Sequence, residues 1–157
     1  MMFWHKKRVP NSLHGPARPL EILVQQWRQP SCYPVAPATS AEVHRVFAMT
    51  GMPATHDVLD LYGAIGGMEN SDANIWRLWP LTEVETSAAD ANEYGVLFSD
   101  YFINCWCYRL KPNDASTSAI YVDHFDGKPL HKVADSLDDF FRLYLHDPLQ
   151  LLDTPSS

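Results

Sequence analysis

Apolar residues near the start of the chain recur at every third or fourth position. Between residues 20 and 28 these residues are Leu20, Leu23, Val24 and Trp27. Such spacing places them on one face of a helix and predicts an amphipathic helix over 20–28. Residues 1–19 contain three prolines and no periodic pattern, so we expect them to form a loosely structured arm.

Two further helices are predicted from their capping residues. Thr39 and Glu42 have the spacing of a capping box, in which each side chain binds the backbone N–H of the other residue. A helix that starts there should end at Gly51. Thr55 can cap the next helix, which ends at Gly66-Gly67. A glycine pair lets the chain leave a helix with a positive φ at little steric cost.

The pattern changes to that of β-strands after the glycine pair. Residues 74–79 predict one strand, and the aromatic and β-branched run from 94 to 110 is too long for a single strand. We place its break at Ser99-Asp100, with strands near 94–98 and 101–110. The strand over 101–110 is apolar on both faces and should therefore lie at the centre of its sheet.

A hairpin and a final helix complete the predicted fold. Asp126-Gly127 suits a type I′ turn between strands over 119–125 and 128–133. Ser136 can cap a last helix that ends before Pro148. Helices are thus followed by strands and then by one helix. This order predicts an α+β fold with N-terminal helices, an antiparallel meander and a C-terminal helix packed on the sheet.

The length of 157 residues fits one domain. We expect it to cover residues 20–152, between the arm of 1–19 and a frayed tail of 153–157. No apolar run is long enough to span a membrane. The cysteines are Cys32, Cys105 and Cys107, an odd number without disulfide spacing. Cys105 and Cys107 should fill space on a shared strand face, and a reducing cytoplasm is the expected location.

Charge is distributed unevenly along the chain. Residues 1–30 hold five Lys/Arg and one acid, whereas residues 31–157 hold seven Lys/Arg and eighteen acids. A basic arm therefore precedes an acidic body. An acidic body disfavours nucleic acid and anionic membranes as partners and favours a basic protein.

The chain lacks the short motifs of nucleophile elbows, phosphate-binding loops and zinc proteases. Its seven histidines do not have metal-ligand spacing. We therefore expect no catalytic residue, metal or cofactor, although an enzyme whose active-site residues are dispersed along the chain stays an alternative.

Two places are candidates for binding a partner. The loop Met68–Asp72 follows the glycine pair and carries Glu69 and Asp72. Loops on a rigid scaffold often carry binding groups. Asp100, at the predicted strand break, is either a turn residue that binds its own backbone or an acid on the rim of a binding face.

Several short motifs occur in a fixed order between about residues 41 and 149. They are Met52-Pro53, Leu61-Tyr62, Gly66-Gly67, Trp79-Pro80-Leu81 with Glu83-Val84, Val96–Tyr101, Tyr108 and Val133–Phe140. In this order the chain resembles the SUKH superfamily, which groups fungal cell-wall-synthesis regulators with many bacterial toxin-immunity proteins. The family often has Leu-Pro in place of Met52-Pro53, and Asn-Gly in place of Gly66-Gly67.

The resemblance implies a compact α+β domain without catalytic residues. Such a domain binds a cognate protein, often a secreted nuclease or another toxin domain, and blocks it. The expected function is therefore that of a bacterial immunity protein. The alternative within the same fold is a regulatory or scaffolding module that binds an endogenous protein.

Overall fold

Helices precede the sheet, as the apolar spacing predicts. The computed structural model describes residues 17–151. Its α-helices are α2 (Pro19–Trp27), α3 (Ser40–Thr50), α4 (His56–Ala64), α5 (Leu81–Thr86) and α6 (Leu137–His146). Single 3-10 turns are η1 (Pro30–Cys32), η2 (Ala88–Asp90) and η3 (Pro148–Leu151). Most of the predicted arm and all of the predicted tail, 153–157, lie outside the described residues.

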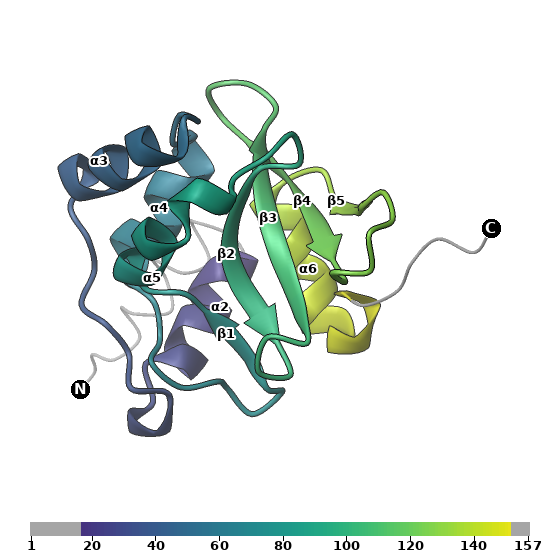
Figure 1. Ribbon diagram of the computed structural model, residues 1–157. Helices are drawn as coiled ribbons and strands as arrows, with labels where there is room; N and C mark the ends of the chain where they lie inside the picture. Colours follow the sequence, from purple (N-terminus) through teal and green to yellow (C-terminus); the bar gives the residue numbers. More distant parts are fainter. Residues whose placement is uncertain (1–16, 152–157) are drawn as a thin grey trace, which may run out of the picture.

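Within residues 17–151, five strands form one antiparallel sheet in which each strand pairs with the next along the chain (Figure 1). They are β1 (Trp76–Leu78), β2 (Val96–Tyr101), β3 (Trp106–Pro112), β4 (Ser118–Asp123) and β5 (His131–Ala134). β3 occupies the centre, as its two apolar faces indicate. α6 packs across one face of the sheet (Figure 1). The predicted α+β class, with a meander and a C-terminal helix on the sheet, is confirmed.

Helix starts follow the predicted capping residues closely. The N–H of Glu42 donates to Thr39 Oγ1 at 3.2 Å, and the N–H of Thr39 donates to Glu42 Oε1 at 3.1 Å, so α3 has its capping box. Ser136 Oγ accepts from the N–H of Asp139 at the start of α6. Thr55 holds the N-cap position of α4, but its side chain makes no capping bond.

The break between β2 and β3 lies later in the chain than predicted. β2 continues through Asp100, and the turn consists of Phe102–Cys105. Because this turn has no Gly or Pro, Asn104, which tolerates left-handed backbone, is the residue that marks its position in the sequence. Its first three residues adopt left-handed backbone, with φ of 53°, 51° and 67°. Cys105 is therefore exposed in the turn while Cys107 is buried in β3, and the prediction of a shared face is wrong.

The β4–β5 connection also differs from the prediction. It covers residues 124–130 rather than two residues, so the type I′ hairpin turn is wrong although the hairpin itself is present. Gly127 takes a φ of 77°, and the Asp126 carboxylate accepts the N–H of Lys128 at 3.0 Å. The Asp-Gly pair thus does form a turn, but this turn lies within a longer loop.

An aromatic cluster joins the first and last helices to the sheet. Trp27 of α2 stacks on Trp76 of β1 with ring centroids 5.1 Å apart, and both rings contact Phe141 of α6 edge-on. Phe140 contacts Trp76 and also Tyr108 of β3. Aromatic pairs of this kind contribute about 0.5–1.5 kcal/mol each beyond the area they bury. The apolar face of the sheet is therefore the side covered by α2 and α6.

The glycine pair after α4 is required by close packing more than by helix exit. A Cβ on Gly66 would lie 2.1 Å from the carbonyl oxygen of Ala36, and one on Gly67 would lie 2.5 Å from Pro80. Of the two, only Gly67 has a positive φ, 120°. The linker before α3 and the end of β1 thus run directly against this segment, which fixes where the loop Met68–Asp72 begins.

Candidate protein-binding surface

The face of the sheet turned away from α6 carries charged side chains. Tyr108 points to α6, so its neighbour Arg109 points to the opposite face, because side chains alternate along a strand. Arg109 Nε lies 3.0 Å from Asp123 Oδ2 on β4, and Arg109 Nη1 donates to the carbonyls of Asp90 and Gly95. All of this guanidinium's partners are thus within the domain, and the pair is buried.

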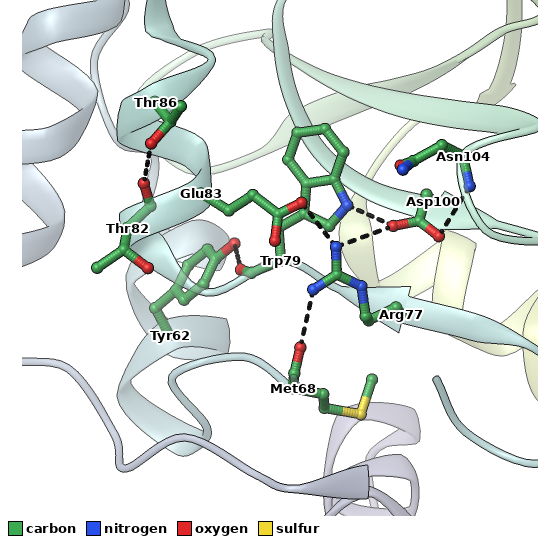
Figure 2. Close-up of polar contacts among 9 residues, drawn as sticks. All are labelled: Tyr62, Met68, Arg77, Trp79, Thr82, Glu83, Thr86, Asp100 and Asn104. Carbon is green, nitrogen blue, oxygen red and sulfur yellow. Dashed lines mark hydrogen bonds and ion pairs between the residues drawn. The ribbon is translucent and has the colours of Figure 1, made fainter. Parts of the chain in front are cut away.

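A second charged cluster lies on the same face at the β1 edge (Figure 2). Arg77 of β1 pairs in register with Asp100 of β2, and its Nη2 lies 3.3 Å from Asp100 Oδ2 and 2.6 Å from Glu83 Oε2. The same Asp100 oxygen accepts Trp79 Nε1–H at 2.5 Å. Arg77 Nη1 donates to the carbonyl of Met68 at 3.2 Å. The cluster therefore ties the start of the loop Met68–Asp72 to the sheet.

The neighbours of Arg77 favour its charged form. Burial by itself lowers the pKa of Arg77, but the hydrogen bonds and negative charges of Glu83 and Asp100 outweigh burial and raise that pKa above its usual value. Burial, with the charge of Glu83 adding to it, strongly raises the pKa of Tyr62, whose hydroxyl donates to the carbonyl of Trp79 at 2.8 Å. These ion pairs and hydrogen bonds hold the start of the loop Met68–Asp72 against the sheet.

Asp72 connects distant parts of the chain. Its Oδ2 accepts Trp27 Nε1–H at 3.0 Å and the hydroxyl of Tyr144. Its Oδ1 accepts the backbone N–H groups of Asn74 at 2.9 Å and Trp76 at 3.2 Å. Burial first, and then the charge of Asp72, strongly raise the pKa of Tyr144, so this hydroxyl stays a hydrogen-bond donor. One carboxylate thus joins α2, β1 and α6.

The three acids chosen from the sequence therefore have different environments. Glu69 is exposed on the loop, where a partner can reach it. Asp72 is half-buried and committed to four internal donors. Asp100 Oδ1 accepts the N–H of Asn104 in the turn after β2, as a turn residue would, but Asp100 is 2% exposed and therefore does not lie on an exposed rim. The reason is that Trp79 and Arg77 require a buried acceptor.

Apolar side chains that the sequence did not single out are exposed at the same end of the sheet. Ile75, Phe102 and Ile103 are 39%, 40% and 78% exposed, and we call them the apolar tip. The N–H of Phe102 donates to the carbonyl of Ile75 at 3.0 Å, which joins the two segments. The ring of Phe102 packs on Tyr101 and Trp106, with centroids 4.7 and 5.6 Å away.

The backbone of the apolar tip is strained. Ile75, Phe102 and Ile103 all have left-handed φ, between 51° and 63°. For residues with a Cβ this conformation costs about 1–2 kcal/mol each, and it is least expected of β-branched residues. Strain of this kind concentrates at functional sites. A signal in the sequence is hard to find, because the run around Phe102 matches a continuous strand.

A cleft of about 460 Å³ lies elsewhere, between α4 and the β3–β4 turn. His44, His56 and Asp114 are among its lining residues. Asp114 accepts the N–H groups of Thr117 and Ser116, and these bonds, with a smaller effect of His56, lower its pKa. The carbonyls of the same turn accept the first N–H groups of α4. The polar groups of the cleft thus close a helix–turn junction.

Within residues 17–151, no group of three or more His, Cys, Asp or Glu side chains is arranged to hold a metal ion. Over the same residues, none of the helices has the length and apolar character needed to cross a bilayer.

The comparisons with known proteins leave the family open. The chain matches no protein-family model, no curated protein and no solved structure.

Proposed function

We propose that this chain is a non-catalytic, cytoplasmic protein-binding domain that binds and neutralises a cognate bacterial toxin, as SUKH-type immunity proteins do. The observation that carries the proposal is the ordered set of SUKH-like motifs from Met52-Pro53 to Val133–Phe140. The helices, the antiparallel meander and the final helix occur in the order that such a domain requires.

The charge of the described surface supports a basic partner. Residues 17–151 contain eighteen Asp/Glu and nine Lys/Arg. Six of these nine basic side chains are in ion pairs within the domain: Arg18, Arg45, Arg77, Arg109, Lys132 and Arg142. Pairing leaves an excess of negative charge at the surface. Such an excess attracts a basic domain, such as a nuclease, and speeds its association.

Internal hydrogen bonding also supports binding over catalysis. The carboxylates of Asp72, Asp100 and Asp123 each accept donors from side chains far away in the sequence. Their positions are explained by cohesion of the fold. A protein that inhibits by covering its partner needs a stable surface rather than a reactive group.

Coexpression tests the proposal. The proposal predicts that a gene next to that of this chain encodes a secreted toxin domain, and this domain is the probe, induced in a host with and without the chain. We expect the chain to restore growth and to copurify with the toxin. If the folded chain neither copurifies nor restores growth, the toxin proposal fails. Stable copurification with an endogenous enzyme instead would favour the regulatory module.

A charge pair of variants sharpens this experiment. Glu69→Lys reverses the charge of an exposed acid on the loop Met68–Asp72. Glu93→Lys reverses the charge of an exposed acid just before β2, at the end of that strand opposite to Phe102. We expect Glu69→Lys to slow association at low salt and Glu93→Lys to slow it much less. Equal on-rates for the two variants would remove Glu69 from the interface.

A further inference from the structure

The apolar tip and the acids predicted to bind a partner belong to one structural unit. The N–H of Ile75 donates to the carbonyl of Asp72 at 2.9 Å, and the N–H of Asn104 donates to Asp100 Oδ1 at 3.3 Å. Each acid therefore holds one of the two turns that carry the tip. In Figure 1 both turns lie at the same end of the sheet, below β1 and β2.

This end of the molecule is negatively charged. Three segments meet there, namely residues 68–76, 99–106 and 143–151, because Asp72 accepts the Tyr144 hydroxyl and the N–H of Phe102 donates to the carbonyl of Ile75. These segments contain Glu69, Asp72, Asp100 and Asp147 and no Lys or Arg, but Arg77, directly after the first segment, offsets the charge of Asp100 in an ion pair. The negative charge at this end therefore comes from Glu69, Asp72 and Asp147. The potential around the tip therefore favours a partner with basic groups.

We propose that the apolar tip is the element by which this domain docks on a basic protein. Ile103 and Phe102 enter an apolar recess of the partner, and Lys or Arg side chains around that recess face Glu69 and Asp147. This inference rests on the proposed function only for the identity of the partner as a toxin. The binding surface and the basic character of the partner are inferred from the tip and its surroundings. Asp72 and Asp100 act as positioning residues.

The physical argument combines exposure, rigidity and charge. An exposed Ile and Phe lose water contacts on docking, and such central apolar side chains carry most of the binding free energy in protein interfaces. Left-handed backbone held by hydrogen bonds presents them in a fixed shape, so little conformational entropy is lost on binding. The acids around them select basic partners and speed encounter.

Ile103→Asn is the variant that tests the tip. Asn tolerates left-handed backbone better than Ile does, so the fold is retained while the apolar side chain is removed. Met49→Ser is the matched control, since Met49 is 53% exposed on α3, away from the tip. With the toxin domain of the preceding section as probe, we expect Ile103→Asn to raise Kd about 30-fold and Met49→Ser to leave it nearly unchanged.

Cys105 supplies a second readout without any substitution. It is the exposed thiol in the same turn, whereas Cys32 and Cys107 are buried. N-ethylmaleimide should alkylate Cys105 in the free full-length chain, and the bound probe should protect it, as seen by intact-mass spectrometry. An unchanged Kd for Ile103→Asn, or undiminished alkylation in the complex, would overturn the proposal.

Other occupants and the failure of the toxin proposal have distinct outcomes. If Cys105 in the pure chain were protected from alkylation more strongly at higher protein concentration, the tip would bind a second copy of the chain. If Cys105 in the pure chain were protected at every concentration and lost that protection when Lys6, Lys7 and Arg8 were reversed in charge, the tip would bind the chain's own basic segment. Either result would overturn the inference. If no toxin binds, the proposed function fails. The inference about the tip still holds if an identified basic cellular protein binds the wild type and Met49→Ser but not Ile103→Asn. If the wild type, Met49→Ser and Ile103→Asn neutralise the toxin equally well, the proposed function holds and the inference about the tip fails.

Discussion

Replacing Asp72 by Asn removes one acceptor from a carboxylate that serves four donors. Trp27 Nε1–H and the Tyr144 hydroxyl share one oxygen, and two backbone N–H groups share the other. Asn has nearly the same shape but only one acceptor oxygen, so its amide NH₂ must face one of the two pairs of donors. Whichever way the amide turns, at least one buried donor loses its partner.

The cost follows from the number and kind of bonds lost. The Tyr144 hydroxyl can rotate and accept from the new amide, which leaves one donor without an acceptor. The loss of a hydrogen bond to a charged group, together with weakening of the others, should lower the free energy of unfolding by about 2–4 kcal/mol. For a domain of this size, such a loss corresponds to a fall in Tm of about 5–15 °C.

Urea unfolding followed by tryptophan fluorescence measures the effect, because Trp27 and Trp76 stack beside the site. Glu69→Gln is the matched control, as it neutralises an exposed acid of the same loop. We expect the control to change the free energy of unfolding by less than about 0.5 kcal/mol. If Asp72→Asn were as stable as Glu69→Gln, the assignment of Asp72 as the link between α2, β1 and α6 would be wrong.

Three other predictions concern strain, packing and ionisation. Ile103→Asn should raise the free energy of unfolding by about 1 kcal/mol by relieving left-handed strain, and unchanged or lower stability would contradict that strain. Gly66→Ala should strongly destabilise the fold, because the new Cβ would lie 2.1 Å from a carbonyl oxygen. Gly63→Ala should instead stabilise α4 by about 0.5–1 kcal/mol, because its new Cβ would lie in open space. Thermal melts of the two variants should therefore shift in opposite directions. Burial raises the pKa of Tyr62 and Tyr108 in the folded state, so the stability these groups contribute is present below the unfolded pKa near 10 and is lost as pH rises above it. Absorbance at 295 nm should therefore show them ionising together with unfolding, and non-cooperative ionisation of all tyrosines in the folded protein would argue against their burial.

The features predicted well from the sequence are those that short-range patterns determine. The Thr39–Glu42 capping box and the Ser136 cap involve residues three positions apart, so the sequence displays them directly. The order of the meander follows from five strand-like runs without intervening helices long enough for crossovers. The central place of β3 follows from its two apolar faces.

The roles of the acids were predicted poorly because they depend on long-range contacts. Asp72 binds Trp27, which is 45 residues away, and Tyr144, which is 72 residues away. Nothing in the local pattern distinguishes this acid from the exposed Glu69. A general signal was present, however, since a buried Trp or Tyr needs an acceptor for its polar hydrogen. Trp27 and Trp79 each find their acceptor in an acid, whereas Trp76 Nε1–H has no partner among the described residues.

The position of the apolar tip was missed for a different reason. Strand propensity favours Phe102 and Ile103 inside a strand, and the turn is formed against that preference. A long-range hydrogen bond from Phe102 to Ile75 and a local one from Asn104 to Asp100 hold the turn in place, and no alternation of polar and apolar residues marks it. Conflict between local preference and observed backbone is itself a reason to look for function at this end of the sheet.

Inhibition of the purified toxin domain by the purified chain decides most directly whether this domain neutralises a toxin. We expect toxin activity to fall in proportion to the chain added and to vanish at a stoichiometric ratio, while Ile103→Asn requires a much larger excess and Met49→Ser behaves as the wild type. Full toxin activity in the presence of a large molar excess of the folded wild-type chain would contradict the proposed function.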